Sequence, residues 1–336
     1  MTGYRSKRLQ GKVTTGRWTL PLAVLIALTG WLLMVLLLPD AAFTGGRTSY
    51  PLWQHYVGSR LSASWGLLLN LLLCGGIGCL LIGVNNSFAL IRMRASVQTA
   101  LYYLLMAACP TLYGLGIGGV VALLMWPSLY FLFRSYQSAR PPVHLFHSFL
   151  CLGIGSLAFP QLTWLAPLFW IGASLFRSFS GRSFFASLLG WSIPYWFLLG
   201  HAFWYGDMAL FCQPFHELVA FTPIRWMTEP WQWATVGYLA LFYLIGAGHC
   251  LLMSHDDKLR TRSFLRFLTW LGGILLLYVW LQPDKGVEML PSLTAVTALL
   301  GGHYLVLTGG RWSNIVFILL MAGWLLLYLW NLWTLL

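Results

Sequence analysis

Long apolar stretches recur along the whole chain and alternate with short polar segments that hold most of the charged residues. A helix needs about 20 apolar residues to cross the hydrocarbon core of a bilayer. Eleven stretches come near this length, and we expect each of them to cross a membrane once. Their ranges are 19–38, 64–84, 97–112, 116–133, 144–159, 162–176, 183–204, 232–253, 264–281, 289–308 and 314–335. The pattern therefore predicts an all-α, polytopic transmembrane helical bundle of about 11 spans.

Composition supports this assignment and excludes two other classes of protein. Hydrophobic residues make up 59% of the 336 residues and charged residues only 8%, whereas a soluble domain carries about 25% charged residues. A disordered chain needs low hydrophobicity and high charge. The net charge of +12 would suggest nucleic acid as a partner of a soluble protein. In a membrane protein, basic residues first indicate which segments lie in the cytoplasm. We expect no nucleic-acid partner.

The distribution of basic residues predicts the orientation. If the N-terminus lies in the cytoplasm and each stretch crosses once, sixteen of the twenty Lys and Arg residues fall on the cytoplasmic side and six of the eight acids fall outside. Basic residues are enriched on the cytoplasmic side of membrane proteins. We therefore expect the N-terminus inside and the C-terminus outside, a basic cytoplasmic segment at 1–17 and a single membrane domain at 18–336. That domain would carry long outer loops at 39–63 and 206–231.

Two consecutive hairpins are short for two crossings each. The second, 144–176, turns at Pro160, and the first, 97–133, turns at Cys109-Pro110. Two full crossings with a turn need roughly 40 residues. Either the bilayer is thinned beside these hairpins, or they are re-entrant and buried among other helices.

The predicted outer side gathers the first set of residues with chemical potential. Asp40 follows the first span directly, where a carboxylate could act as a general base or bind a divalent cation; it could equally be a helix-end carboxylate. Arg47, Arg60 and Arg225 depart from the inside bias and could hold a phosphate, because arginine binds phosphate with two parallel hydrogen bonds. They could also contact lipid headgroups.

A second set lies near the outer end of the seventh span. His201, Asp207, His216 and Glu217 are close in sequence, and a histidine beside a carboxylate can exchange protons near neutral pH. In a catalytic arrangement Asp40, His216 and Glu217 would act on the substrate, while Asp207 and His201 would help to bind it. The alternative is an interfacial segment with ordinary amphipathic decoration.

Two polar residues lie within predicted spans: Asn70 in the second and His303 in the tenth. Polar side chains at membrane depth are candidates for function. A neutral Asn or His can, however, also be present only to form an interhelical hydrogen bond that satisfies its own polar groups. We favour the second interpretation. The cysteines show no ligand spacing, so we expect no metal site. No cofactor is expected either, except a divalent cation if the protein is catalytic.

Several short motifs resemble a known family. The segments are Val84–Arg94, Cys109-Pro110, Leu132–Gln137, Ser156–Pro160 and Leu189–Phe197. Together they resemble an uncharacterised multi-pass inner-membrane family of Bacteroidota, classed as a domain of unknown function, over residues 80–225. The resemblance implies the inner membrane of a Gram-negative cell and supplies no activity or catalytic residue.

The architecture is also similar, more loosely, to that of GT-C type membrane glycosyltransferases. These have many spans, an N-terminus inside, and a catalytic acid in the first outer loop, the place that Asp40 occupies here. The chain departs from that pattern because its first outer loop is short and has no second acid beside Asp40.

Three functions follow from these observations as hypotheses. The first is cell-envelope biogenesis, in which the protein acts on a lipid-linked precursor, of the polyprenyl-phosphate sugar kind, at the periplasmic face. The second is a non-catalytic subunit that scaffolds other envelope-assembly membrane proteins. The third is a lipid or solute translocator, which would need a hydrated cavity near Asn70 or His303. Membrane lipid is the expected partner in each.

Overall fold

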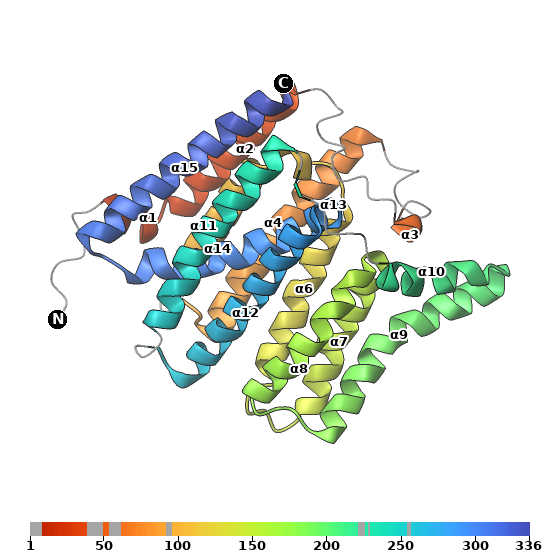
Figure 1. The fold of residues 1–336 in the computed structure, drawn as a ribbon. Coiled ribbons are helices and arrows are strands. Elements are labelled where there is room, and N and C mark those ends of the chain that lie inside the picture. The colour runs from red at the N-terminus through yellow and green to blue at the C-terminus, as the bar shows by residue number, and fades with distance from the viewer. Residues whose placement is uncertain are drawn as a thin grey trace. The chain divides into compact units, whose positions relative to one another are not determined.

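The structure is a computed structural model. It describes residues 9–38, 50–53, 62–91, 96–220, 226–227, 229–253 and 257–336. Every regular element in these ranges is a helix (Figure 1), which confirms the predicted all-α class for the described part of the chain. The chain divides into two compact units, Met1–Gly46 with Leu67–Leu115 and Arg225–Leu336, and Arg47–Gly66 with Gly116–Ile224. We call them unit 1 and unit 2.

Unit 1 combines the first helices of the chain with the last ones. Its elements are α1 (Leu9–Thr14), α2 (Thr19–Leu37), α4 (Ala63–Phe88, apart from its first turn), α5 (Val97–Ala107), η3 (Pro110–Leu112), α11 (Pro230–Leu252), α12 (Leu259–Leu281), α13 (Pro283–Gly286), η6 (Val287–Met289), α14 (Leu290–Leu307) and α15 (Arg311–Leu335). Unit 2 is continuous in sequence except for a short segment. Its elements are α3 (Pro51–Trp53), α6 (Ile117–Arg134), α7 (Pro141–Ala158), η4 (Pro160–Leu165), α8 (Ala166–Leu175), α9 (Gly181–Tyr205) and α10 (Met208–Val219).

Nine helical segments among the described residues are long and apolar enough to cross a membrane. They are α2, α4, α6, α7, α9, α11, α12, α14 together with the short turns before it, and α15. The chain thus has the architecture of a multi-pass membrane protein. The predicted stretches 97–112 and 162–176 are different, because their helices α5 and α8 have 11 and 10 residues. At 1.5 Å per residue these helices measure about 16 and 15 Å, half of a hydrocarbon core.

Proline explains why both helices are short. Pro110 and Pro160 each begin a 3-10 turn, and proline cannot donate the backbone hydrogen bond that an α-helix interior requires. The chain nevertheless changes direction at each short helix. Within unit 1, Thr99 and Tyr103 of α5 donate to the carbonyls of Gly78 and Gly75 on α4, so these two helices are antiparallel.

The short helix α5 lies inside unit 1, with nine of its eleven residues buried. Its C-terminal carbonyls need partners because the helix stops within the protein. Asn331 of α15 donates from Nδ2 to the Ala108 carbonyl at 2.7 Å. Asn70 of α4 donates from Nδ2 to the carbonyls of Leu112 at 2.6 Å and Tyr113 at 3.1 Å. Two amide side chains therefore stabilise the break after α5.

The core of unit 1 is α14, of whose 18 residues all but Tyr304 and Leu307 are buried. Close packing against α11 depends on glycine. A Cβ on Gly246 would lie 2.8 Å from the backbone nitrogen of Gly301, so the two helices approach at a distance that only a hydrogen side chain permits. This contact fixes the end of α11 against the end of α14.

Unit 2 is built around α7, which packs between α6 and α9. Ser128 of α6 contacts Ser148 of α7 through both hydroxyl groups. The Ser156 hydroxyl on α7 contacts the Tyr195 hydroxyl on α9 at 2.9 Å, and a Cβ on Gly190 would lie 2.3 Å from the Phe146 carbonyl oxygen. Residues late in α7 contact residues late in α9, so these two helices are parallel. The segment η4–α8, which connects them in sequence, leads the chain back from the end of α7 to the start of α9.

Each unit has a basic end. In unit 1 the polar contacts of Gln10 with Leu305 and Thr308 bring α1 to the end where α14 stops and α15 begins. Seven of the eight described Lys and Arg residues of unit 1 gather near this end: Lys12, Arg17, Lys258, Arg260, Arg262, Arg266 and Arg311. The opposite end holds Glu229, Asp284, Lys285 and Glu288.

Unit 2 shows the same polarity independently. The hydroxyl groups of Ser135 and Ser178 lie 2.8 Å apart, which joins the end of α6 to the end of α8. The basic residues Arg134, Arg140, Arg177 and Arg182 flank this junction. The acids Asp207 and Glu217 lie beyond the far end of α9.

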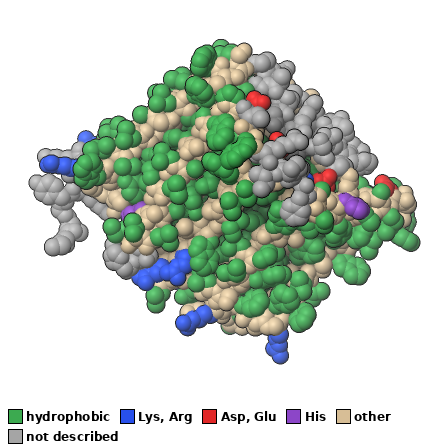
Figure 2. All heavy atoms as spheres, viewed as in Figure 1, with side chains coloured by type: hydrophobic (Ala, Val, Ile, Leu, Met, Phe, Trp, Pro, Cys, Tyr) green, Lys and Arg blue, Asp and Glu red, His purple; other side chains and the backbone are tan. Residues whose placement is uncertain are grey.

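The surface is largely apolar. Hydrophobic side chains cover most of the described surface that faces the viewer in Figure 2, and charged side chains are few. Exposed leucines line α2 and α15, and large aromatic residues such as Phe197, Phe203 and Trp204 are exposed on α9. An apolar surface of this extent is stable in lipid rather than in water.

Candidate functional site

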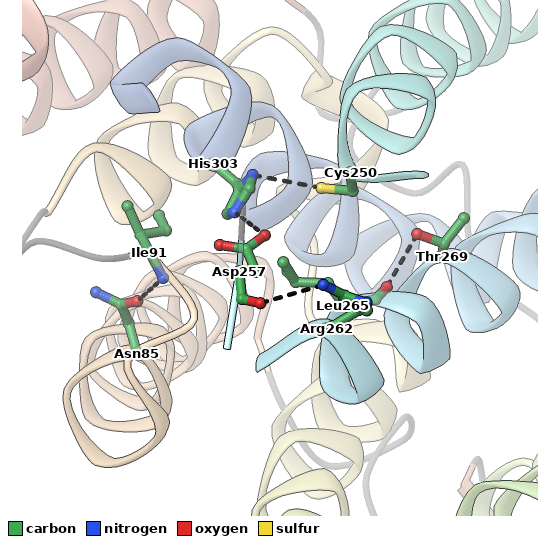
Figure 3. A network of polar contacts seen from close by, with 8 residues as sticks. All are labelled: Asn85, Ile91, Cys250, Asp257, Arg262, Leu265, Thr269 and His303. Carbon is green, nitrogen blue, oxygen red and sulfur yellow. Dashed lines mark hydrogen bonds and ion pairs between the residues drawn. The ribbon is translucent and has the colours of Figure 1, made fainter. Parts of the chain in front are cut away.

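A buried cluster of Cys250, Asp257 and His303 is the site with the clearest chemical potential. Nε2 of His303 lies 3.5 Å from Oδ2 of Asp257, and both side chains are only 1% exposed. Nδ1 of the same imidazole lies 3.5 Å from Sγ of Cys250, whose residue is 3% exposed. Figure 3 shows the imidazole between the thiol and the carboxylate, so that each ring nitrogen faces a different titratable group.

Three elements of unit 1 supply these side chains. Cys250 lies in the last turn of α11, Asp257 lies two residues before the start of α12, and His303 lies near the end of α14. The local sequence explains the fit, because Gly301 and Gly302 precede the histidine. A Cβ on Gly302 would come within 3.2 Å of the Cα of Gln98 on α5. The glycine pair therefore lets α14 pack closely between α5 and α11.

Charged and aromatic groups border the cluster. Nη2 of Arg262 donates to the Asp257 backbone carbonyl at 3.5 Å, which is the long limit of a hydrogen bond. The His249 ring lies 5.5 Å from the His303 ring and 5.3 Å from the ring of Tyr304. The basic end of unit 1 thus reaches the cluster through one arginine and one histidine.

Gln98 adds a buried amide near the cluster. Its residue is fully buried, and neither its Nε2 nor its Oε1 has a hydrogen-bond partner among the described residues. Burying an amide without a partner costs about 1–3 kcal/mol on mutational scales. Because Gln98 packs against the residue before His303, this region has a polar group that a water molecule would satisfy.

The arrangement favours proton chemistry over metal binding. Asp257 and Cys250 contact opposite nitrogens of one imidazole, so the three side chains do not converge on a single point. Among the described residues no group of three or more His, Cys, Asp or Glu side chains could hold a metal ion. Imidazole is the side chain that most readily exchanges protons near neutral pH.

The histidines and carboxylates of the predicted outer segment lie along α9 and α10 in unit 2. The His201 ring lies against the Tyr205 ring in a tilted arrangement, with centroids 4.6 Å apart. Asp207 is the N-cap of α10, where its carboxylate accepts from the backbone nitrogen of Leu210 at 3.3 Å. His216 is exposed and Glu217 half-buried. Asp207 therefore has a structural role, whereas the His216 side chain is exposed to the surroundings.

The segment that contains α10 is packed against the protein at one edge. Nε2 of Gln161 in η4 donates to the Glu217 carbonyl at 3.2 Å. Its Oε1 accepts from the Tyr50 hydroxyl at 3.0 Å, and the Tyr50 ring contacts Phe159 edge to face. The predicted outer loop 206–231 thus contains a docked helix.

Four predicted site residues, Asp40, Arg47, Arg60 and Arg225, lie outside the described residues. Asn70 is described, and its amide is used to cap the break after α5. His303 makes interhelical contacts, as we favoured from the sequence, but one of its partners is a carboxylate.

Sequence reasoning missed Asp257 and Cys250. Asp257 reads as an ordinary acid in a polar segment, and Cys250 as a small apolar residue near the end of a span. One signal was available: Asp257 is an acid beside Lys258, Arg260 and Arg262, in a segment predicted to be cytoplasmic and basic. Comparison with protein-family models, curated proteins and solved structures found no match to the chain.

Proposed function

We propose that the protein is a multi-pass inner-membrane protein with its N-terminus in the cytoplasm and its C-terminus outside. We further propose that it takes part in cell-envelope assembly by acting on a lipid-linked precursor at the outer face. The observation that supports this orientation most is the shared polarity of the two units. Each places most of its described basic residues at one end and most of its described acids at the other, in agreement with the positive-inside rule.

The outer face in this orientation includes α10. This helix has an apolar side that faces η4, where Pro214 is buried, and a side that exposes His216. Exposed aromatic residues precede it at the end of α9, including Trp204 at 83% and Tyr205 at 71% exposure. Trp and Tyr are enriched at membrane–water interfaces, and an amphipathic helix lies in the interface plane. We infer that α10 lies where the headgroup of a lipid-borne substrate would be.

Asp40, Arg47, Arg60 and Arg225 complete the proposal from the sequence. In a catalytic mechanism Asp40 would activate an acceptor hydroxyl or bind a divalent cation, and the arginines would hold the phosphate of the lipid carrier. The chemistry requires a carboxylate and a phosphate-binding cation on the same side of the membrane, which the proposed orientation provides.

Mass spectrometry of lipids that copurify with the native protein in mild detergent tests this function. We expect a polyprenyl-phosphate-linked saccharide, and we expect Asp40→Asn to accumulate that precursor in cells without lowering the protein level. Asp284→Asn is the matched control, because Asp284 is an exposed acid at the same predicted side. A stoichiometric protein partner without any such lipid would support the scaffold instead and contradict the proposal.

A further inference from the structure

The Asp257–His303 pair has no place in the outer-face function, because it lies in the basic end of unit 1. Two ionisable side chains that are 1% exposed are expensive to keep charged in a membrane protein. The cost falls when opposite charges face each other, and the 3.5 Å separation between Nε2 and Oδ2 is within ion-pair range. A buried pair of this kind adds little net stability, because the cost of desolvation offsets the attraction between the charges.

The thiol contacts the imidazole and the imidazole contacts the carboxylate. A nucleophilic triad has the same order, because a base contacts the nucleophile and an acid orients the base. Exposure decides against this role. Reactive cysteines lie in partly exposed positions, and buried ones are inert, whereas Cys250 is 3% exposed and its thiol faces the imidazole. Proton exchange does not need this access for a substrate, and imidazole exchanges protons near neutral pH.

We propose that Asp257 and His303 form a proton-binding site, with Cys250 as a hydrogen-bond partner that serves both of its states. In the protonated state, imidazolium N–H groups point to the carboxylate from Nε2 and to the sulfur from Nδ1. When the proton leaves Nδ1 for water at the basic end of unit 1, the Cys250 S–H turns and donates to Nδ1, while Nε2–H still faces Asp257. The thiol fits both states because sulfur can donate or accept.

The groups around the pair set the balance between the two states. Among the described residues, Arg262 on α12 and His249 on α11 lie nearby and can be positive, and a positive charge on either disfavours a charged imidazole. Arg260 contacts the rings of Phe88 and Phe264. The Tyr304 hydroxyl belongs to α14 itself, and α5 contributes the uncharged amide of Gln98. Of the groups that the structure describes around His303, the Asp257 carboxylate carries the opposite charge and favours the protonated imidazole.

Proton loss has a mechanical consequence in this position. Asp257 lies between α11 and α12, while His303 lies on α14, so the ion pair ties the start of α12 to the central helix of unit 1. Neutralising the imidazole weakens that tie. Protonation would thus control how tightly the start of α12 packs against α14, which links the pH of the compartment at the basic end to the packing of unit 1.

Hydrogen–deuterium exchange of the full-length protein in detergent micelles tests the proposal. Exchange is compared at about pH 5.5 and about pH 8.5, on either side of the ordinary imidazole pKa, with correction for the intrinsic pH dependence. Amides of 262–266, where the hydrogen bonds of α12 begin, and of 303–307 should lose protection by about tenfold at the higher pH, the factor that one pKa unit of interaction corresponds to. Asp257→Asn and His303→Gln should both abolish this pH dependence, and His249→Gln should keep it.

The wild-type measurement needs no variant, so a variant that fails to fold does not prevent the test. Corrected protection that is equal at both pH values in the wild-type protein would overturn the proposal. The proposal would also be overturned if the Asp257→Asn protein showed the same difference in protection between the two pH values as wild type. A hydroxylamine-sensitive acyl group on Cys250 in the native protein would also contradict it, because the thiol would then be a nucleophile. None of these outcomes bears on lipid binding at the outer face.

Discussion

Nε2 of His303 on α14 lies 3.5 Å from Oδ2 of Asp257, which lies two residues before the start of α12. The two side chains come from segments far apart in the sequence, and each is almost completely buried. Removing one partner of a buried ion pair leaves an uncompensated charge, so the pair should behave as one energetic unit.

Thermal unfolding in detergent should show this coupling as a double-mutant cycle. We expect Asp257→Asn and His303→Gln each to lower the free energy of unfolding by about 3 kcal/mol. The double variant should lose less than the sum, with a coupling of about 1–3 kcal/mol. Additive losses would mean that the two side chains do not interact in the folded protein.

The close approach of α11 to α14 predicts a difference between two neighbouring glycines. Gly246→Ala should destabilise the protein by about 1–3 kcal/mol, because the new methyl group meets the backbone of Gly301 and Leu300. Gly248→Ala is the matched control, since a Cβ there meets nothing within 4 Å, and it should be neutral or stabilising by up to about 1 kcal/mol. Equal effects in thermal unfolding would show that α11 does not present this face to α14.

The amide caps at the end of α5 predict a cost for Asn70→Leu. The substitution leaves the Leu112 and Tyr113 carbonyls without their donor, at about 1–3 kcal/mol for an unsatisfied buried group. Asn86→Leu on the same helix is the control, because Asn86 is exposed. If the two variants unfold at the same temperature, Asn70 does not support the break. Its place in a substrate path would then be the better explanation.

Thiol labelling tests the burial pattern of the cysteines. Cys212 on α10 and Cys79, which lies within the candidate span α4, are exposed, while Cys109 and Cys250 are buried. A membrane-impermeant maleimide added to the outer side of spheroplasts should label the wild-type protein at Cys212, and Cys212→Ser should remove most of the signal. All six cysteines should react after denaturation in detergent. Labelling of Cys109 in the folded protein would contradict the packing of α5.

The apolar pattern predicted most of the helices, because length and hydrophobicity are local properties that a lipid environment converts directly into spans. It overestimated the length of the helices at 97–112 and 162–176, although Pro110 and Pro160 mark in the sequence where each α-helix is interrupted. A short helix that is buried by its neighbours has the same composition as one that crosses the membrane. The apolar stretches at 97–112 and 162–176 each include residues of a 3-10 turn, so the length of the stretch did not reveal how short the α-helix is.

The candidate site was less accessible to sequence reasoning. The role of Asn70 depends on where a neighbouring helix ends, which only the tertiary packing determines. The pairing of Asp257 with His303 depends on the antiparallel return of α14, so no local spacing predicts it. The outer residues His201, Asp207, His216 and Glu217 were found by proximity in sequence, but Asp207 caps a helix, a role that its position before an amphipathic segment could have suggested.

The orientation of the two ends of the chain tests the central claim most directly. Reporters are fused before residue 1 and after Leu336, one active only in the cytoplasm and one active only in the periplasm, and each is measured at both ends. We predict a cytoplasmic signal at the N-terminus and a periplasmic signal at the C-terminus. Signals from the same compartment at both ends would contradict the orientation and would remove α10 from the face where the proposed substrate lies.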